Sequence, residues 1–483
     1  MEQKEEQLGL TVKKHEDFNE WYNQIVLKAD LIDYTLVSGC IVFKPNSYAI
    51  WEKIQRIFDD KIKRSGHKNC YFPMFIPESL LKREAEHVKG FTPEVAWVTR
   101  AGNTELNEKL AIRPTSETIM YESYSKWVRS WRDLPLLLNQ WNSVVRWEFK
   151  HAKPFLRTRE FLWQEGHTVH STMEEAEKEV MQQLFEYVDL MENHMAIPVI
   201  AGKKTENEKF AGALYTTTAE ALMPDGKALQ MATSHMLGQN FSKAFGIKFL
   251  DIDEKEKHAW QTSWGLSTRT IGAIIMMHGD DKGLVLPPKI APIQAVIVPI
   301  IFKDKKDEIV ENAKLILKML REKNISVHLD DRDSYTAGWK FNEWEMKGIP
   351  LRIELGPKDI EAAQVVLVRR DTNEKEAVKI KDLAASVEQI MDDMQESMLK
   401  KAKSMMADRL IEVHNFNDFV EAIKNKKLAK SVFCGESECE IHIKEKTEGA
   451  TCRCIPFEQK PAKGNCVHCG KQGKFWAVFG KAY

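Results

Sequence analysis

The 483-residue sequence has no apolar run long enough to cross a membrane, and its first residues are too charged for a secretory signal. We therefore expect a cytoplasmic protein with no membrane partner. The sequence also lacks an excess of charge of either sign, because 70 Lys and Arg face 71 Asp and Glu, a net charge of −1. Any nucleic acid would then be held by local basic patches and not by the field of the whole molecule.

Cysteine is scarce over most of the chain, where Cys40 and Cys70 stand alone. The other six crowd near the C-terminus, as Cys434-x4-Cys439, Cys452-x-Cys454 and Cys466-x2-Cys469. A disulfide scaffold would spread its cysteines through a small secreted chain, so this arrangement indicates zinc. Four thiolates make a closed structural site, and the spacing leaves open which four of the six bind.

The length and composition predict a multidomain globular protein, since 43% of the residues are hydrophobic and 29% are charged. Strands and helices alternate from about residue 287, which predicts a small α/β domain with a mixed sheet. A helix-rich stretch and the cysteines follow it. We place the domains at 1–286, 287–385 and 386–483.

The first 45 residues offer one helix, over about 15–31, and no pattern that carries chemistry. A second, amphipathic helix begins near Pro45, carries an isoleucine stripe and stops at Ser65-Gly66. It leads into a predicted strand over 69–75. Pro73 cannot donate to a ladder, so it belongs at a sheet edge or a subunit boundary.

Residues 145–167 read as two strands joined by a charged loop. Alternation sends Val145, Trp147 and Phe149 to one face of the first strand, and it gives Trp163, Glu165 and His167 a common face in the second. The loop carries five basic side chains, Lys150, His151, Lys153, Arg157 and Arg159. This pattern suits an anion, although for the hairpin alone a solvated surface with salt bridges is the commoner meaning.

Thr115 and Glu117 lie in the segment RPTSET, residues 113–118. In an extended chain they would aim a hydroxyl and a carboxylate at one point, which suits an ammonium or a secondary amine. A helix N-cap with a capping-box glutamate is the alternative, and this motif alone favours it.

Two later segments carry further polar candidates. Gln230, Thr233, Ser234 and His235 lie close together, although such a histidine is more often a satisfied core residue. Arg269 opens an apolar helix just after Gly265, where a buried arginine calls for an anionic partner.

Together these segments resemble the class II aminoacyl-tRNA synthetases, and more closely the prolyl-tRNA synthetases of the archaeal and eukaryotic type. Motif 1 of these enzymes is similar to residues 50–73, which end at Pro73. Motif 2 is similar to Arg146-Trp147-Glu148 together with residues 155–161. Motif 3 is similar to residues 265–273, which include Arg269. The segments 113–118, 156–168, 232–241 and 347–359 are similar to the prolyl branch in particular. The resemblance implies a multidomain α+β and α/β protein with an antiparallel-sheet catalytic domain, an α/β anticodon-binding domain and a C-terminal zinc-binding α/β domain.

The resemblance implies a ligase that activates L-proline with ATP to prolyl-adenylate and transfers it to the 3′ end of tRNA(Pro). It implies Mg²⁺ with ATP, a structural Zn²⁺ and a homodimer. The short span between motifs 2 and 3 leaves no room for the editing insertion of the bacterial type. Two alternatives stay open, a class II synthetase for another amino acid and a non-catalytic tRNA-binding paralogue.

The resemblance also assigns residues. Arg146 would bridge the proline carboxylate and the α-phosphate, and Arg269 would hold the γ-phosphate, so both are expected to be catalytic. The implied ATP-binding set is Arg146, Glu148, Arg157, Thr158, Gln230, Thr233, Ser267, Thr268 and Arg269. The implied proline-binding set is Phe91, Thr115, Glu117, Arg146, Trp163, Glu165, His167 and His235.

Outside the catalytic domain, the resemblance makes Glu345, Arg352 and Lys358 the anticodon readers, with a surface salt-bridge cluster as the alternative. It favours Cys434, Cys439, Cys466 and Cys469 as the zinc ligands. It also brings the carboxylate of the terminal Tyr483 towards the active site.

Overall fold

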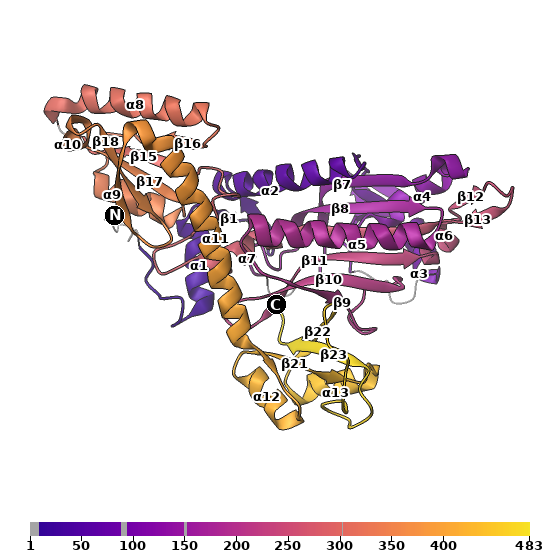
Figure 1. The fold of residues 1–483 in the computed structure, drawn as a ribbon. Coiled ribbons are helices and arrows are strands. Elements are labelled where there is room, and N and C mark those ends of the chain that lie inside the picture. Colours follow the sequence, from indigo (N-terminus) through magenta and orange to yellow (C-terminus); the bar gives the residue numbers. More distant parts are fainter. Residues whose placement is uncertain (1–8, 88–93, 149–151, 302) are drawn as a thin grey trace.

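A computed structural model describes residues 9–87, 94–148, 152–301 and 303–483 (Figure 1). A long sheet forms the centre of the molecule, and a smaller α/β domain stands at one end of it. In the described part of the chain, no helix combines the length and apolar character needed to cross a membrane.

Strands from the middle and the end of the chain share the central sheet. Their order is β20 (Leu410–Glu412), β21 (Leu428–Phe433), β23 (Phe475–Gly480), β22 (Thr451–Pro456), β9 (Ile200–Lys203), β10 (Tyr215–Leu222), β11 (Ala228–Gly238), β14 (Trp260–Ser267), β8 (Glu160–His170), β7 (Leu136–Val145) and β3 (Lys68–Asn69). The pairings from β22 through β7 are antiparallel, which confirms the expected antiparallel catalytic sheet.

Helix α5 (Met173–Asp189) lies across one face of this sheet and buries Val180, Leu184 and Tyr187 (Figure 1). The predicted helices near the N-terminus and after motif 3 are also present, as α1 (Phe18–Lys28), α2 (Pro45–Arg64) and α7 (Arg269–His278). Their buried side chains join one hydrophobic cluster with the sheet. Proline at the first position of α2 costs nothing there, because that N–H has no partner within a helix.

The single strand predicted over 69–75 is wrong. Pairing with β7 stops at Asn69, and the chain resumes as β4 (Phe75–Pro77), which pairs with β6 (Thr104–Ile112) beside β5 (Trp97–Ala101). Pro73 lies between the two short strands, where its missing N–H breaks no ladder.

The smaller domain has the expected mixed sheet. Its strands run in the order β16 (Val327–Leu329), β15 (Ala295–Pro299), β17 (Leu351–Leu355), β18 (Gln364–Arg369) and β19 (Lys375–Lys379). β15 is parallel to β16 and β17, while the remaining pairs are antiparallel. The helices α8 (Lys306–Glu322), α9 (Ala337–Met346) and α10 (Pro357–Glu361) complete it.

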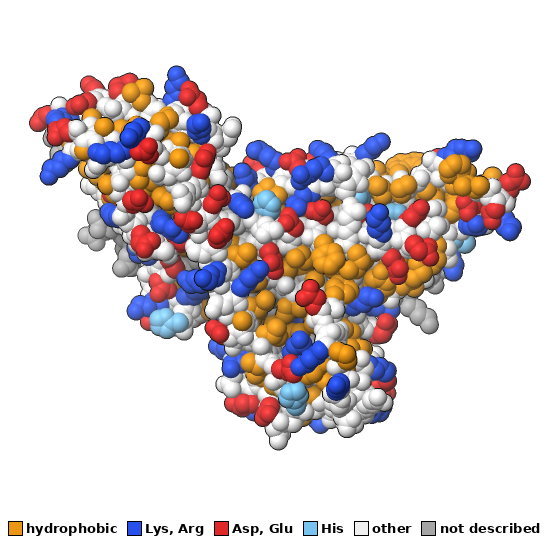
Figure 2. Space-filling view, viewed as in Figure 1, with side chains coloured by type: hydrophobic (Ala, Val, Ile, Leu, Met, Phe, Trp, Pro, Cys, Tyr) orange, Lys and Arg blue, Asp and Glu red, His pale blue; other side chains and the backbone are white. Residues whose placement is uncertain are grey.

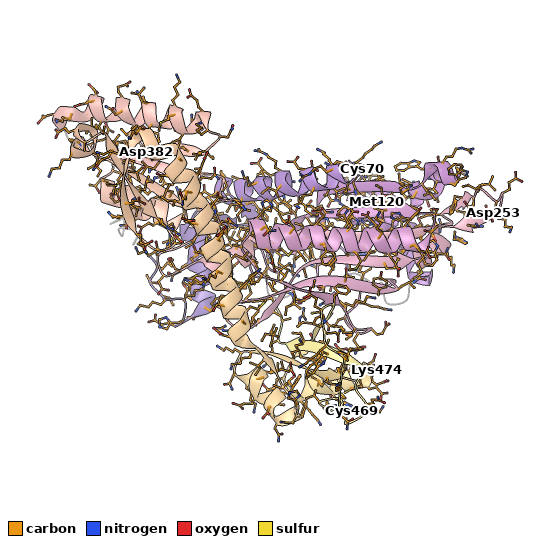
Figure 3. The ribbon with its side chains drawn as sticks, viewed as in Figure 1. Cys70, Met120, Asp253, Asp382, Cys469 and Lys474 are labelled. Atoms are coloured by element: carbon orange, nitrogen blue, oxygen red, sulfur yellow. The ribbon has the colours of Figure 1, made fainter. Side chains whose placement is uncertain are left out.

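Helix α11 (Leu383–Arg409) runs from this domain to the C-terminal part of the chain, which holds α12 (Phe416–Lys424) and α13 (Ser437–Lys446). Figure 3 shows Asp382 and Cys469 in the two regions that this helix connects. The remaining elements are β1 (Ile32–Tyr34), β2 (Ile41–Phe43), α3 (Glu78–His87), α4 (Glu117–Trp127), α6 (Asn240–Phe245), β12 (Lys248–Leu250) and β13 (Glu256–His258). The domain boundaries proposed from the sequence stay predictions.

The C-terminal strands extend the central sheet, which no sequence pattern indicated. In the register, Ile455 and Pro456 of β22 lie opposite Lys203 and Gly202 of β9. A Cβ on Gly202 would lie 2.4 Å from the carbonyl oxygen of Ile455, so a side chain at this position would separate the two strands.

A buried ion network stabilises the same junction. The Lys204 ammonium lies 2.7 Å and the Arg453 guanidinium 3.0 Å from the two carboxylate oxygens of Glu220, and each side chain is less than 10% exposed. Burial alone would raise the pKa of Glu220, but the two cations outweigh it and lower that pKa. The carboxylate is therefore ionised at neutral pH.

We expect Arg453→Met to lower the thermal midpoint by several degrees, because removing one partner of a buried ion pair costs about 3 kcal/mol or more. The loss should shrink below about pH 4.3, the ordinary pKa of glutamate, because a carboxylate with a lowered pKa loses its stabilising effect as the pH falls through that lowered value. Calorimetry of the variant and the unaltered protein, at neutral pH and below about pH 4.3, checks this. The control is Lys248→Met, which removes an exposed pair with Glu256 worth less than about 1 kcal/mol; equal losses in the two variants would contradict the prediction.

Candidate active site

A cavity of about 430 Å³ opens on the face of the central sheet opposite α5. Trp163, Glu165 and His167 of β8 line it, as their predicted common face requires. Gln164, between them, points the other way and accepts a hydrogen bond of 2.6 Å from Tyr187 of α5. The alternation predicted for the second strand of the hairpin is therefore confirmed.

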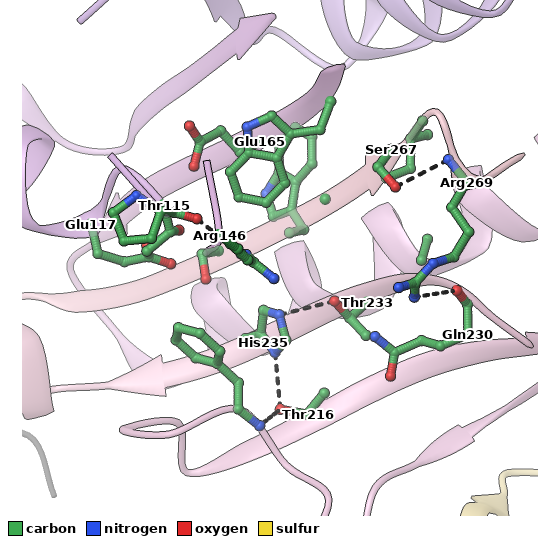
Figure 4. A pocket seen from close by; sticks show the side chains of 18 of the residues that line it. Thr115, Glu117, Arg146, Glu165, Thr216, Gln230, Thr233, His235, Ser267 and Arg269 are labelled. Atoms are coloured by element: carbon green, nitrogen blue, oxygen red, sulfur yellow. Dashed lines mark hydrogen bonds between the residues drawn. The ribbon is translucent and has the colours of Figure 1, made fainter. Parts of the chain in front are cut away.

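Arg146 lies near the middle of this cavity (Figure 4). The first strand is shorter than predicted, because β7 ends at Val145; Arg146 and Glu148, which the alternation assigned to one face, nevertheless both line the cavity, and Phe149 lies outside the described residues. The backbone N–H of Arg146 still donates to the Arg159 carbonyl at 2.7 Å. Arg146 is an even number of residues from Gln140 and Asn142, whose side chains contact Glu165, so the strand alternation directs its side chain into the cavity as well.

The Arg146 guanidinium is held by one backbone contact and two aromatic rings. Its Nε donates to the Pro114 carbonyl at 3.0 Å, and its carbon lies 5.4 Å and 5.6 Å from the ring centroids of Phe161 and Trp163. Burial lowers its pKa, although Glu148 and Glu117 act in the opposite direction. It stays charged, because an arginine does not deprotonate in a protein at neutral pH.

Arg269, the first residue of α7, supplies a second guanidinium. Its Nε and Nη1 donate to the carbonyls of Leu156 and Gln230, each at 3.3 Å. Burial and the charge of Arg146 lower its pKa to about 10. The cavity therefore holds two cations that repel each other, an arrangement that an anionic ligand would stabilise.

Thr115 and Glu117 face the cavity from the start of α4, where Figure 4 shows them beside Arg146. Neither interpretation of their motif is correct in detail: Glu117 is the first helical residue, so the segment is not extended, and Ser116 makes no capping bond. The Thr115 hydroxyl instead donates to the Glu117 carboxylate, and the Ser116 hydroxyl to Glu165. The paired hydroxyl and carboxylate are nevertheless present.

Glu165 and His167 form a buried ion pair, with Nε2 of His167 2.9 Å from the carboxylate. Gln140 and Asn142 also donate to Glu165, each at 2.8 Å. Burial opposes both charges, but the contact with His167 lowers the pKa of Glu165, while Glu117 and Glu165 raise that of His167. The contact thus favours the charged forms of both groups, at the end of the cavity next to Thr115.

His235 is neutral by contrast, because burial and the charges of His167 and Arg146 lower its pKa to about 3. Its ring nitrogens contact the hydroxyls of Thr216 at 2.9 Å and Thr233 at 3.0 Å, and its ring lies 4.8 Å from that of Phe210. It is both a satisfied histidine and part of the cavity wall.

The structure collects most of the candidate residues at this cavity. Beyond those already described, its wall includes Glu148, Gln230, Thr233 and Ser267. Four candidates are not on the wall: Arg157 is exposed, Thr158 donates to the Glu160 carbonyl, and Ser234 and Thr268 are buried. Phe91 lies outside the described residues.

The lining residues that escaped the sequence analysis include Phe161, Glu208, Phe210 and Ser263. The first was detectable, since Phe161 precedes Trp163 by one strand period. Phe210 lies in a loop and reaches His235 only through the tertiary fold, so no local pattern marks it.

The described residues place metal-ligating atoms within 4.8 Å of one another in two groups. One comprises Cys434, Cys439, Cys466 and Cys469. The other comprises Glu117, Glu165 and His167; Glu165 and His167 already pair with each other, and a protonated histidine has no lone pair left for a metal.

The cysteine group is compatible with a tetrahedral zinc site. The Cys439 and Cys466 sulfurs are 3.7 Å apart, as are those of Cys434 and Cys469. Four sulfurs about 2.3 Å from one zinc ion would be separated by about 3.8 Å. Cys452 and Cys454 lie apart from this group, on β22.

The three anticodon candidates are only partly brought together. Arg352 pairs with Glu345 at 3.0 Å and with Glu354 at 2.9 Å, beside the Phe341 ring. Lys358 lies on α10, exposed and outside this network. Figure 2 shows blue and red side chains interspersed over the visible face of this domain, consistent with local patches and not a uniform basic surface.

Three family models match successive parts of the chain. Residues 97–278 match the tRNA synthetase class II core domain (G, H, P, S and T), and residues 294–390 match an anticodon binding domain. Residues 416–483 match the C-terminal domain of prolyl-tRNA synthetase.

Full-length relatives agree with these matches. A proline–tRNA ligase of Alkaliphilus oremlandii is 54% identical over the whole of both chains, and proline–tRNA ligase 2 of Clostridioides difficile is 53% identical over 98% of this chain and 97% of its own. A Saccharomyces cerevisiae relative, also named as a proline–tRNA ligase, is 49% identical over 99% of this chain and 73% of its own. The chain therefore belongs to the prolyl-tRNA synthetase family of class II aminoacyl-tRNA synthetases.

Proposed function

We propose that this protein is a proline–tRNA ligase, which joins proline to ATP and then transfers the prolyl group to tRNA(Pro). One observation carries the proposal: Arg146 lies in a single cavity between an amine-binding group, Thr115 with Glu117, and a second cation, Arg269 (Figure 4). Adenylate formation needs these three functions side by side, because a carboxylate must approach a phosphate against their mutual repulsion.

At the amino-acid end, Thr115 and Glu117 receive the proline nitrogen, and Trp163 covers the ring. The Glu165–His167 ion pair fixes the floor of this subsite, since its charges are satisfied by each other and by Gln140 and Asn142. Glu117 therefore keeps its carboxylate available for the ammonium of the substrate. The neutral His235 adds no charge to repel it.

At the nucleotide end, Arg146 contacts both the proline carboxylate and the α-phosphate, and Arg269 contacts the γ-phosphate. The planar fork of a guanidinium suits two oxygen atoms at once. As the carboxylate attacks phosphorus and pyrophosphate leaves, charge develops on the α-phosphate oxygens, and the fixed guanidinium of Arg146 stabilises it. Gln230, Thr233 and Ser267 line the nucleotide path.

Magnesium would accompany ATP, bound mainly by phosphate oxygens and water. Among the acidic residues, the exposed carboxylate of Glu148 at the rim fits this ion, or the adenine amino group. For transfer, the terminal ribose hydroxyl of tRNA attacks the prolyl carbonyl carbon and AMP leaves.

We further propose that the protein acts in the cytoplasm as a homodimer. Large apolar side chains are exposed around the end of motif 1, including Tyr71 at 68%, Phe75 at 42% and Trp127 at 50%. Such a group of exposed aromatic residues is typical of a subunit contact.

The proposal predicts proline-dependent exchange of pyrophosphate into ATP. Arg146→Ala should reduce this exchange by at least about 10², because it removes preorganised positive charge from the reacting phosphate. The matched control is Arg321→Ala on α8, an exposed arginine in the other domain. Exchange with a different amino acid but not with proline would refute the substrate, and near-normal exchange in Arg146→Ala would refute the role of that residue.

Anticodon reading by Arg352 is tested with Arg352→Lys, which keeps the charge beside Glu345 and Glu354 but loses the guanidinium fork. We expect pyrophosphate exchange to stay unchanged, while kcat/KM for tRNA(Pro) falls by roughly tenfold or more, the worth of one bidentate base contact. Equal kcat/KM values for tRNA(Pro) in Arg352→Lys and in the unaltered protein would favour the alternative, in which Arg352 forms a salt bridge and takes no part in recognition.

The cysteine group predicts one bound zinc per chain. Cys434→Ser should lower the zinc content measured by atomic emission and destabilise the C-terminal domain. Cys452→Ser, another buried cysteine outside the group, should retain full zinc. Full zinc in Cys434→Ser and reduced zinc in Cys452→Ser would instead assign the site to Cys452 and Cys454.

A further inference from the structure

The motif 2 loop contains a tight turn with an unfavourable backbone conformation. Lys153 and Arg157 exchange backbone hydrogen bonds of 2.8 Å and 2.9 Å, and Phe155 between them has φ +61°. A bulky residue in the left-handed region costs roughly 1–3 kcal/mol, so such a turn persists only where the surroundings hold it.

Helix α1 contacts this turn from one side. The buried Tyr22 hydroxyl donates to the Pro154 carbonyl at 2.7 Å. The Lys153 ammonium lies 4.9 Å, 5.0 Å and 5.8 Å from the ring centroids of Tyr22, Tyr483 and Phe18, and it donates to Asn19 at 2.9 Å. An ammonium among three aromatic faces is attracted to each, and the partial burial strengthens that attraction.

The segment around β2 contacts the other side of the turn. The Phe155 ring, 2% exposed, meets the Phe43 ring edge-on at 5.4 Å. Further along the loop, the backbone of Arg159 donates to the Gly39 carbonyl at 2.8 Å and its guanidinium to Ser38 at 3.0 Å. The N-terminal region therefore contacts the motif 2 loop at several separate points.

This turn also contacts the nucleotide end of the cavity. The carbonyl of Leu156, next to Phe155, accepts the hydrogen bond from Nε of Arg269. The packing leaves no slack, because a Cβ on Gly272 of α7 would lie 2.5 Å from Leu156 and 3.1 Å from the Tyr22 hydroxyl. A shift of the turn would therefore move the acceptor that orients the Arg269 guanidinium.

We propose that Tyr22 is a positioning residue for ATP binding. Tyr22 holds the strained motif 2 turn against α1 and thereby fixes the position of the Leu156 carbonyl, which orients Arg269. The proposal rests on the assignment of the cavity to proline activation. It gives the N-terminal helix a part in nucleotide binding, although none of its residues lines the cavity. The amino-acid subsite, built from α4 and β8, does not depend on this contact.

Tyr22→Phe tests the proposal, because it deletes one hydroxyl and keeps the ring beside Lys153. In pyrophosphate exchange, KM for ATP should rise about five- to tenfold, the factor that one net hydrogen bond contributes to an equilibrium, while KM for proline stays within about twofold. The Kd of ATP from calorimetric titration should rise by the same factor. Lys153→Met, which removes the ammonium, should shift both constants in the same direction.

The matched control is Tyr187→Phe, which deletes an equally buried hydroxyl whose bond to Gln164 lies on the opposite face of the sheet. It should leave KM for ATP unchanged. Unchanged ATP constants in Tyr22→Phe, or equal rises for ATP and proline, would overturn the proposal. Absence of proline-dependent exchange in the unaltered protein would instead refute the proposed function, and the ATP titration would still test the Tyr22 contact.

Discussion

The structure of the site depends on holding two guanidinium groups close together in a partly desolvated cavity. Burial lowers the pKa of Arg269, and the repulsion from Arg146 lowers it further. Each arginine is therefore fixed by neutral acceptors, Arg146 by Pro114 and Arg269 by Leu156 and Gln230. Backbone carbonyls orient a cation without neutralising it, which leaves the charge available to phosphate and carboxylate groups.

The amino-acid end follows the opposite rule, because its charges are neutralised where they do not face the substrate. Glu165 is satisfied by His167, Gln140 and Asn142, whereas Glu117 accepts a hydrogen bond from the Thr115 hydroxyl. An internally satisfied network is rigid, and it sets the shape of the wall. The cavity thus separates the Glu117 carboxylate from the Arg269 guanidinium, with Arg146 between them.

Patterns of apolar and polar residues in the sequence indicated those elements whose buried face is set by helix or strand geometry. The arginine that opens α7 came from its position just before an apolar helix, and the stripe of α2 and the shared face of Trp163, Glu165 and His167 came from periodicity. The end of β7 at Val145 did not, because apolar alternation continues past the last rung of the ladder. The capping-box interpretation of RPTSET failed because Ser116 binds Glu165, 49 residues away, in place of its own helix. For the cysteines, spacing allowed several sets, and only the fold brings Cys434 and Cys469 together.

The junction between the C-terminal strands and the central sheet had no local signature at all, yet it bears on the site. Glu220, whose ion network holds β22 against β9, lies opposite Gln230 of β11, and the carbonyl of that residue orients Arg269. The Glu220 carboxylate also offsets part of the repulsion that Arg146 exerts on Arg269. A buried ion pair contributes little net stability over an apolar contact, but it specifies one geometry. In this sheet the pair aligns β22 with β9, two strands away from the β11 carbonyl that orients Arg269.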